Sequence, residues 1–148
     1  MKTLLSFLLL FSFLQAEDDT FKVVYDLTTK NIKTFEKKVI KGIVANKTYY
    51  ENNFKELEVA VIIHGGAYKF FINNIKESPF KNNKKLLKKR VASLAQTYDV
   101  KFYICKVGLQ THHINENNLA KFVQIIPNAS IGLINKQHEG FAYIPVAD

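Results

Sequence analysis

The residues of this 148-residue chain best suited to chemistry are its single cysteine, Cys105, and a histidine, His64. A thiolate is a strong nucleophile, and an imidazole gains and loses protons near neutral pH. Each follows an apolar run that predicts a strand, because Leu57–Ile63 precedes His64 and Val100–Ile104 precedes Cys105. Ligand sites in open parallel sheets form beyond the carboxyl ends of the strands. If these two strands are neighbours, Cys105 and His64 face one crevice, and they are our predicted catalytic residues.

Two glycines, Gly65 and Gly66, follow His64 directly. Glycine adopts backbone angles that other residues avoid, so the chain can turn sharply there and lie close to a ligand. We expect both glycines to belong to a binding site for a small anionic group, which nearby helix N-termini would also favour. The alternative is that the histidine and the glycines make an ordinary turn after a strand.

A histidine pair, His112 and His113, follows Cys105 by seven and eight residues. A loop of this length can fold back toward the thiol, so both histidines are predicted binding residues. Cysteine with several histidines also suits zinc or copper(I), but the spacing fits no established zinc motif. We therefore predict no metal and no cofactor. His138 comes near a predicted helix end, where a cation complements the helix dipole, and we interpret it as structural.

Cys105 also has a structural interpretation. Free cysteine is among the most buried residue types, and a small inert thiol in the core needs no function. A lone cysteine cannot form a disulfide within its own chain. The sequence leaves the reactive and the structural interpretations open.

Strands and helices alternate along the chain, as β-branched and aromatic runs give way to apolar residues at helical spacing. Strands are predicted at Phe21–Leu27, Leu57–Ile63, Val100–Ile104, Phe122–Ile126 and Phe141–Val146. Longer helices are predicted at 31–52, around 87–98, and from Asn128 to Gly140; short ones are predicted at 67–73 and 116–121, and a loop around Pro79 and Asn82-Asn83. The alternation predicts a single small α/β domain with a mainly parallel five-stranded sheet covered by helices on both faces.

The N-terminus has the layout of a secretory signal peptide. Lys2 precedes an apolar run from Leu4 to Leu14, which is shorter than the roughly 20 residues that cross a bilayer as a permanent helix. We expect cleavage after Ala16, which divides the chain into a signal peptide, residues 1–16, and an α/β domain, residues 17–148. The mature protein is then expected to be soluble, in the periplasm or otherwise secreted, without permanent membrane insertion.

The chain is basic, with a formal net charge of +8. A basic balance often indicates nucleic acid, but an exported protein rarely meets any, so we predict no nucleic-acid partner. Anionic membrane surfaces and acidic partners are the better candidates. The lysines between 84 and 89 are expected to form the solvated face of their helix.

Three segments have a recognisable order and spacing. They are a strand followed by His-Gly (Val61–Gly66), a strand that ends in cysteine before a small residue and leucine (Val100–Leu109), and an aromatic strand after a Gly-ended helix (Gly140–Ile144). Together they resemble the DsrE-like family, also called the DsrE/DsrF-like sulfur-relay family, over nearly all of residues 17–148. The resemblance implies a small domain that assembles as a homo-oligomer, most often a trimer or hexamer. It also implies that the cysteine matched by Cys105 can carry sulfur as a persulfide.

Motifs of several enzyme classes are missing from the sequence. It contains no Gly-x-Ser-x-Gly elbow, no Walker loop, no dinucleotide glycine fingerprint and no close acidic pair. Whether the protein is an enzyme therefore stays open. We hypothesise a periplasmic protein that binds or carries a small sulfur species on Cys105, with His64 as proton donor or acceptor. The alternative hypothesis is a non-catalytic oligomeric binding module in which Cys105 is a core residue.

Overall fold

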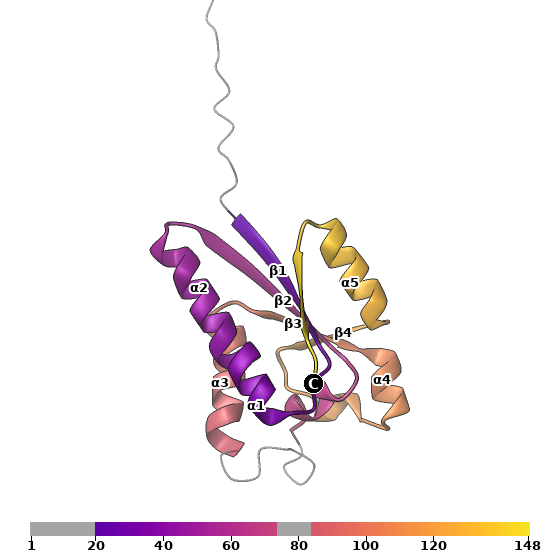
Figure 1. Ribbon diagram of the computed structural model, residues 1–148. Helices are drawn as coiled ribbons and strands as arrows, with labels where there is room; N and C mark the ends of the chain where they lie inside the picture. Colours follow the sequence, from indigo (N-terminus) through magenta and orange to yellow (C-terminus); the bar gives the residue numbers. More distant parts are fainter. Residues whose placement is uncertain (1–19, 74–83) are drawn as a thin grey trace, which may run out of the picture.

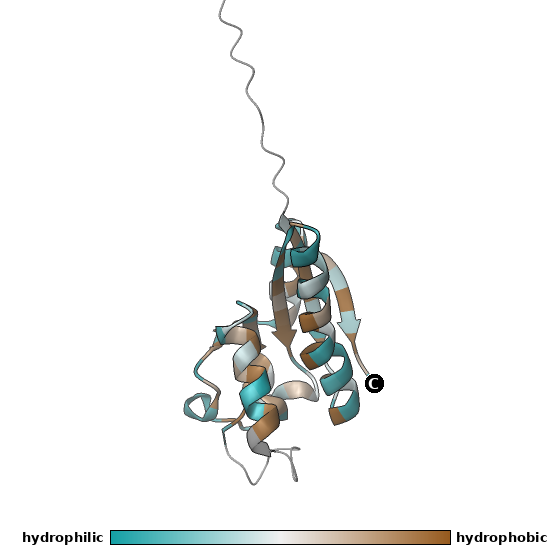
Figure 2. Ribbon diagram, turned by 90° about the vertical axis from the view of Figure 1, so that its left-hand side faces the viewer, coloured by the Kyte–Doolittle hydropathy of each residue, from teal (hydrophilic) through white to brown (hydrophobic). Residues whose placement is uncertain are grey.

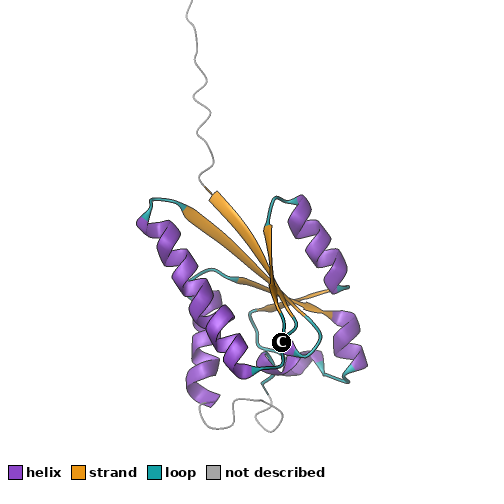
Figure 3. Cartoon of the chain, viewed as in Figure 1, coloured by secondary structure: helices purple, strands orange, loops and turns teal. Residues whose placement is uncertain are grey.

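A computed structural model describes residues 20–73 and 84–148 of the chain. Figures 1 and 3 show a twisted sheet with helices on both of its faces. The strands are β1 (Thr20–Leu27), β2 (Glu56–Ile63), β3 (Lys101–Cys105), β4 (Val123–Ile126) and β5 (Ala142–Val146), in the spatial order β4-β3-β2-β1-β5. All four pairings between these strands are parallel, which confirms the predicted α/β class and the five strands. The predicted signal peptide and the loop around Pro79 lie outside the described residues.

One long helical run covers the first face of the sheet. It consists of α1 (Ile32–Thr34), the π-helical segment η1 (Phe35–Lys41) and α2 (Gly42–Asn52), so the helix predicted over 31–52 is confirmed. Asn31 begins the run, because its side chain accepts hydrogen bonds from the backbone of Lys33 and Thr34. Helix α3 (Lys84–Gln96) lies on the same side in Figure 1 and contacts η1.

Helix α5 (Ala129–His138) covers the opposite face of the sheet. As predicted, it begins after Asn128, whose side chain accepts a 2.7 Å hydrogen bond from the backbone of Ser130, and it ends before Gly140 at a φ of +89°. The helix packs closely on the sheet at Gly132. A Cβ atom there would lie only 2.5 Å from the side chain of Ile126, so a larger residue would push the helix away.

The core consists of aromatic and branched aliphatic side chains between these layers. Figure 2 shows that the central strands are the most hydrophobic part of the ribbon. The rings of Phe35 and Phe70 stack at 4.0 Å, and Phe71 packs edge-on against Phe35. These contacts join the first helical run to the segment that follows β2, and so hold that segment at the carboxyl end of the sheet.

The connections at the carboxyl ends of the strands differ from the predicted ones. Helix α4 (Lys106–Thr111) starts directly after Cys105, in place of the loop expected between Cys105 and the histidine pair. It buries Leu109 and thereby joins the core. The short helices predicted at 67–73 and 116–121 are shorter 3-10 turns, η2 (Ala67–Phe70) and η3 (Glu116–Asn118). Within residues 20–73 and 84–148, no helix is both long and apolar enough to cross a membrane.

Candidate functional site

His64 and Cys105 lie beside one another at the carboxyl ends of two central strands. Strands β2 and β3 pair in parallel as far as Ile63 and Ile104, and His64 and Cys105 are the residues that directly follow this last pair. Residues opposite one another in neighbouring strands point to the same face of the sheet. The structure thus brings together the two residues that the sequence singled out for chemistry.

His64 is held by a carboxylate on the strand at its other side. Its Nε2 atom lies 2.6 Å from Oδ1 of Asp26, near the end of β1. The second carboxylate oxygen of Asp26 accepts a 2.6 Å hydrogen bond from the hydroxyl group of Tyr143 on β5. That hydrogen bond is the main reason why the pKa of Tyr143 is raised above its ordinary value. A Tyr143–Asp26–His64 chain of hydrogen bonds therefore crosses three strands and leads to the neighbour of Cys105.

The Asp26 contact also sets which nitrogen of His64 can accept a proton. Because a carboxylate only accepts hydrogen bonds, neutral His64 must donate through Nε2–H, and Nδ1 then carries the lone pair. An imidazole in this tautomer can accept a proton at Nδ1, which is the role of the base in catalytic Cys–His pairs. The side chain of Asp26 is only 15% exposed, which strengthens its interaction with the ring.

Cys105 itself is buried, with an exposure of 7%. The hydroxyl group of Tyr68, from η2, lies 3.4 Å from the carbonyl oxygen of Cys105. Burial raises the pKa of Tyr68 above its ordinary value, and the charge of Cys105 and a hydrogen bond with its side chain raise it further. The phenol therefore stays protonated and can donate a hydrogen bond to the sulfur.

The position of Tyr68 depends on Gly108 in α4. A Cβ atom at this glycine would fall 1.5 Å from the Tyr68 hydroxyl oxygen, far closer than atoms can approach. The glycine therefore lets the phenol reach Cys105.

A pocket with a volume of about 450 Å³ lies beside Tyr68. Its walls include Gly65 and Gly66 from the turn after β2, Lys69 from η2, and His112 at the end of α4. The rings of Tyr68 and His112 lie 5.3 Å apart. Gly65 has a φ of +58°, the left-handed region that glycine adopts without strain, and this shapes the turn. Tyr68 is thus shared by the pocket wall and the surroundings of Cys105.

Three of the four predicted binding residues line this pocket, namely Gly65, Gly66 and His112. His113 is exposed and is not among the residues that line it. His138 is the last residue of α5, at the helix end where the sequence predicted it. Among residues 20–73 and 84–148, no three His, Cys, Asp or Glu side chains are close enough to hold a metal ion.

Sequence reasoning missed Asp26, Tyr68 and Tyr143. A signal existed for Asp26, which is the one acidic residue in the otherwise apolar and basic strand Phe21–Leu27. An acid near the carboxyl end of a parallel strand is well placed for a ligand site. The other two residues gave no comparable signal, since aromatic residues are ordinary in strands and in the segments that follow them.

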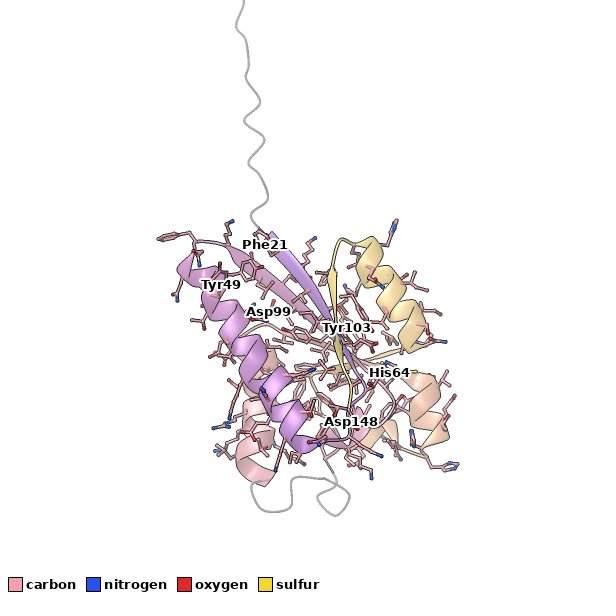
Figure 4. The ribbon with its side chains drawn as sticks, in the orientation of Figure 1. Phe21, Tyr49, His64, Asp99, Tyr103 and Asp148 are labelled. Carbon is pink, nitrogen blue, oxygen red and sulfur yellow. The ribbon has the colours of Figure 1, made fainter. Side chains whose placement is uncertain are left out.

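The loop after β1 lies next to the turn that follows β2. The buried hydroxyl group of Thr29 donates a hydrogen bond to the side chain of Asp148, which also accepts from the backbone amides of Lys30 and Asn31. These hydrogen bonds, with that of Thr29 first, lower the pKa of Asp148 below its ordinary value of 3.8. The backbone of Gly66 packs against Lys30, so this clamp supports the loop that borders the pocket. Figure 4 shows His64 and Asp148 at the same end of the molecule, opposite to Phe21 and Tyr49.

Comparisons with known proteins agree with this architecture. The model of the DsrE/DsrF-like family matches residues 22–146. A protein of unknown function from Methanobacterium thermoautotrophicum, MTH1491, has a similar solved structure with a TM-score of 0.63 and 18% sequence identity, covering 84% of this chain and 98% of that one. An uncharacterized protein from Aquifex aeolicus is 27% identical over 93 residues, 62% of this chain. The aligned part spans only 41% of that relative's length.

Proposed function

The chain belongs to the DsrE/DsrF-like family, and from this premise we propose that it is an exported protein that carries sulfur on Cys105 as a persulfide. The observation that supports this most is the position of Cys105 beside His64 at the carboxyl ends of β2 and β3. Nucleophile and proton acceptor share one edge of the sheet, and Asp26 orients the imidazole. Tyr68 adds a hydrogen-bond donor on the sulfur.

The transfer needs no oxidant. His64 takes the proton of the Cys105 thiol, and the thiolate attacks the terminal sulfur of a donor that contains an S–S bond. A new S–S bond forms on Cys105, the S–S bond of the donor breaks, and the donor group leaves with the electron pair. The persulfide that results is an anion, which a hydrogen bond from the protonated phenol of Tyr68 stabilises.

Mass spectrometry of the intact protein tests this function. After brief exposure to a polysulfide and removal of the excess, the wild-type protein should gain the mass of one sulfur atom, and the added sulfur should be lost on reduction. Cys105→Ser should gain nothing, because Cys105 is the only cysteine of the chain. His64→Ala should gain the sulfur more slowly. If the wild type gains no sulfur under conditions that load a free thiol, the proposal is wrong.

The burial of Cys105 favours a second candidate, an oligomeric binding module in which this residue only packs the core. Cys105→Ser separates the two. In the core interpretation the added hydroxyl group lacks a partner and costs roughly 1–3 kcal/mol of unfolding free energy. In the carrier interpretation the Tyr68 hydroxyl and His64 provide hydrogen-bond partners, so the unfolding free energy in urea should stay close to that of the wild type.

We also propose that the chain is exported to the periplasm, or otherwise secreted, by cleavage near residue 16. The supporting observation is that β1 begins at Thr20, so the predicted cleavage leaves every strand intact. N-terminal sequencing of the exported protein should give Glu17 or a close neighbour as its first residue. Recovery of the complete chain in the membrane fraction would contradict this.

A closed homo-oligomer, a trimer or a hexamer, is the third part of the proposal. Both edge strands, β4 and β5, have one side without a paired strand among the described residues, and α5 exposes Ile131 and Ile134. Exposed sheet edges and apolar side chains are commonly covered in assemblies. Light scattering should give a mass of three or six chains, and Ile134→Lys should lower it. A monomer at micromolar concentrations would refute this part.

A further inference from the structure

The pocket beside Tyr68 has the size and the shape of a site for a small ligand. Its volume of about 450 Å³ falls within the range of ligand sites in proteins, about 300–1,000 Å³. Segments from three parts of the chain surround it: the Gly65-Gly66 turn, η2 and the end of α4. Both glycines lack side chains, which keeps this part of the wall open.

The polar groups of the pocket favour an anion. The polar side chains among its lining residues are those of Lys69, His112 and Tyr68, and no Asp or Glu lines it. Among residues 20–73 and 84–148, no carboxylate lies within 4.0 Å of the Lys69 nitrogen. A cation at the wall of a partly enclosed pocket attracts anions more strongly than one on an open surface.

Three acidic side chains, those of Glu116, Asp148 and Asp26, have partners outside the pocket. Glu116 lies 3.9 Å from the ammonium group of Lys106. Asp148 accepts hydrogen bonds from Thr29 and the adjacent backbone, and Asp26 accepts from His64 and Tyr143. Among the described residues, none of these three carboxylates forms an ion pair with Lys69.

Tyr68 connects this pocket to the thiol. One part of its side chain lines the pocket, and its hydroxyl group contacts the carbonyl oxygen and the side chain of Cys105. Tyr68 is therefore the one lining residue of the pocket for which a hydrogen bond with Cys105 is found among the described residues.

We propose that this pocket binds the sulfur donor, and that the donor is a small anionic compound in which a sulfane sulfur is attached to a negatively charged leaving group. The inference rests on the proposed function of Cys105 and adds the substrate class. Lys69 and His112 hold the negative group, and the sulfane sulfur faces Tyr68 and Cys105. With thiosulfate, the Cys105 thiolate forms a bond to the outer sulfur and the S–S bond of thiosulfate breaks. Sulfite then leaves with the electron pair, so atoms and charge balance.

Binding is measured first without the reaction. The Cys105→Ser protein, or Cys105→Ala as a second variant, is titrated with thiosulfate at constant ionic strength and followed by amide NMR. We expect chemical-shift changes at Gly65, Gly66 and His112, and a dissociation constant that rises about tenfold in Lys69→Gln. Lys37→Gln is the matched control, because it removes the same charge from an exposed position on η1. It should leave the dissociation constant unchanged.

A second measurement uses the native thiol. Iodoacetate is an anion and iodoacetamide is neutral, so the ratio of their rates with Cys105 reports on the charge around the thiol. This ratio should fall severalfold in Lys69→Gln and stay constant in Lys37→Gln.

These measurements distinguish a failure of the pocket proposal from a failure of the proposed function of Cys105. If thiosulfate shifts none of the pocket amides, or if Lys69→Gln binds it as tightly as the parent protein, the pocket assignment is overturned even where Cys105 accepts sulfur from a neutral donor. If Cys105 accepts sulfur from no donor while the pocket still binds thiosulfate, the proposed function fails and the donor role fails with it.

Discussion

The Nε2 atom of His64 lies 2.6 Å from Oδ1 of Asp26, so the carboxylate selects the tautomer of the imidazole that has its lone pair on Nδ1. Asp26→Asn should therefore slow sulfur uptake by Cys105 roughly tenfold at neutral pH, because the amide no longer favours this tautomer. The rate is measured by mass spectrometry at several pH values, and the pH dependence should change as well as the rate.

Tyr143→Phe is the control for this variant. It removes the second hydrogen bond of Asp26 and keeps the carboxylate, so its rate should fall by less than about threefold. Equal rates in Asp26→Asn and the wild type would show that His64 needs no orientation.

Removal of the Tyr68 hydroxyl group should affect the thiol more than the fold. Tyr68→Phe loses a 3.4 Å hydrogen bond to the carbonyl oxygen of Cys105 and the contact with its side chain. Alkylation of Cys105 should slow about fivefold, the effect of one hydrogen bond worth ~1 kcal/mol. Tyr25→Phe is a matched control, because it also removes a buried, hydrogen-bonded hydroxyl group, whose partner is Asn46. Similar alkylation rates in the two variants would exclude a role of Tyr68 at the sulfur.

Gly108→Ala should destabilise the protein although it lies in a helix. Alanine normally stabilises a helix by up to about 1 kcal/mol relative to glycine. Here its Cβ atom would lie 1.5 Å from the Tyr68 hydroxyl oxygen, and such overpacking costs about 1–3 kcal/mol. Urea unfolding should show a net loss, whereas Gln110→Ala at an exposed position of α4 should change little. A more stable Gly108→Ala protein would mean that the phenol moves aside freely.

The Asp148 clamp predicts a stability difference that depends on pH. Because hydrogen bonds lower the pKa of Asp148 below 3.8 in the folded protein, its charge stabilises the fold above this pH. The stabilisation is lost as the pH falls through the lower folded value. Asp148→Asn should therefore melt at a lower temperature than the wild type near neutral pH, and the two melting curves should converge well below pH 3.8. A difference that stays constant over this range would contradict the charge-based explanation.

The sequence was sufficient to predict the layers of the fold and the residues that follow the ends of the strands. Periodicity identified all five strands, and the cap residues Asn128 and Gly140 located both ends of α5, because these signals are local. His64 and Cys105 could be assigned to strand ends for the same reason. That these strands are neighbours became known only from the strand order.

The rest of the site depends on contacts between distant parts of the chain. The Asp26–Tyr143 hydrogen bond joins residues 117 positions apart and requires β5 to lie beside β1, which alternation of strands and helices does not determine. The approach of Tyr68 to Gly108 is likewise a matter of packing. Helix α4 was missed because its six residues are too few to show a period.

The place of β5 in the sheet has a consequence for the order in which the site is assembled. Among the described strands, β5 comes last along the chain and pairs with β1, which comes first. A nascent chain that ends just after β4 already contains Asp26, His64 and Cys105, but Tyr143 and Asp148 have not yet been added. Cys105 and His64 can therefore take their places in the sheet before the hydrogen bonds of Tyr143 and Asp148 can form. Completion of the site therefore waits for β5, and a nascent chain stalled before Ala142 would expose the unpaired side of β1.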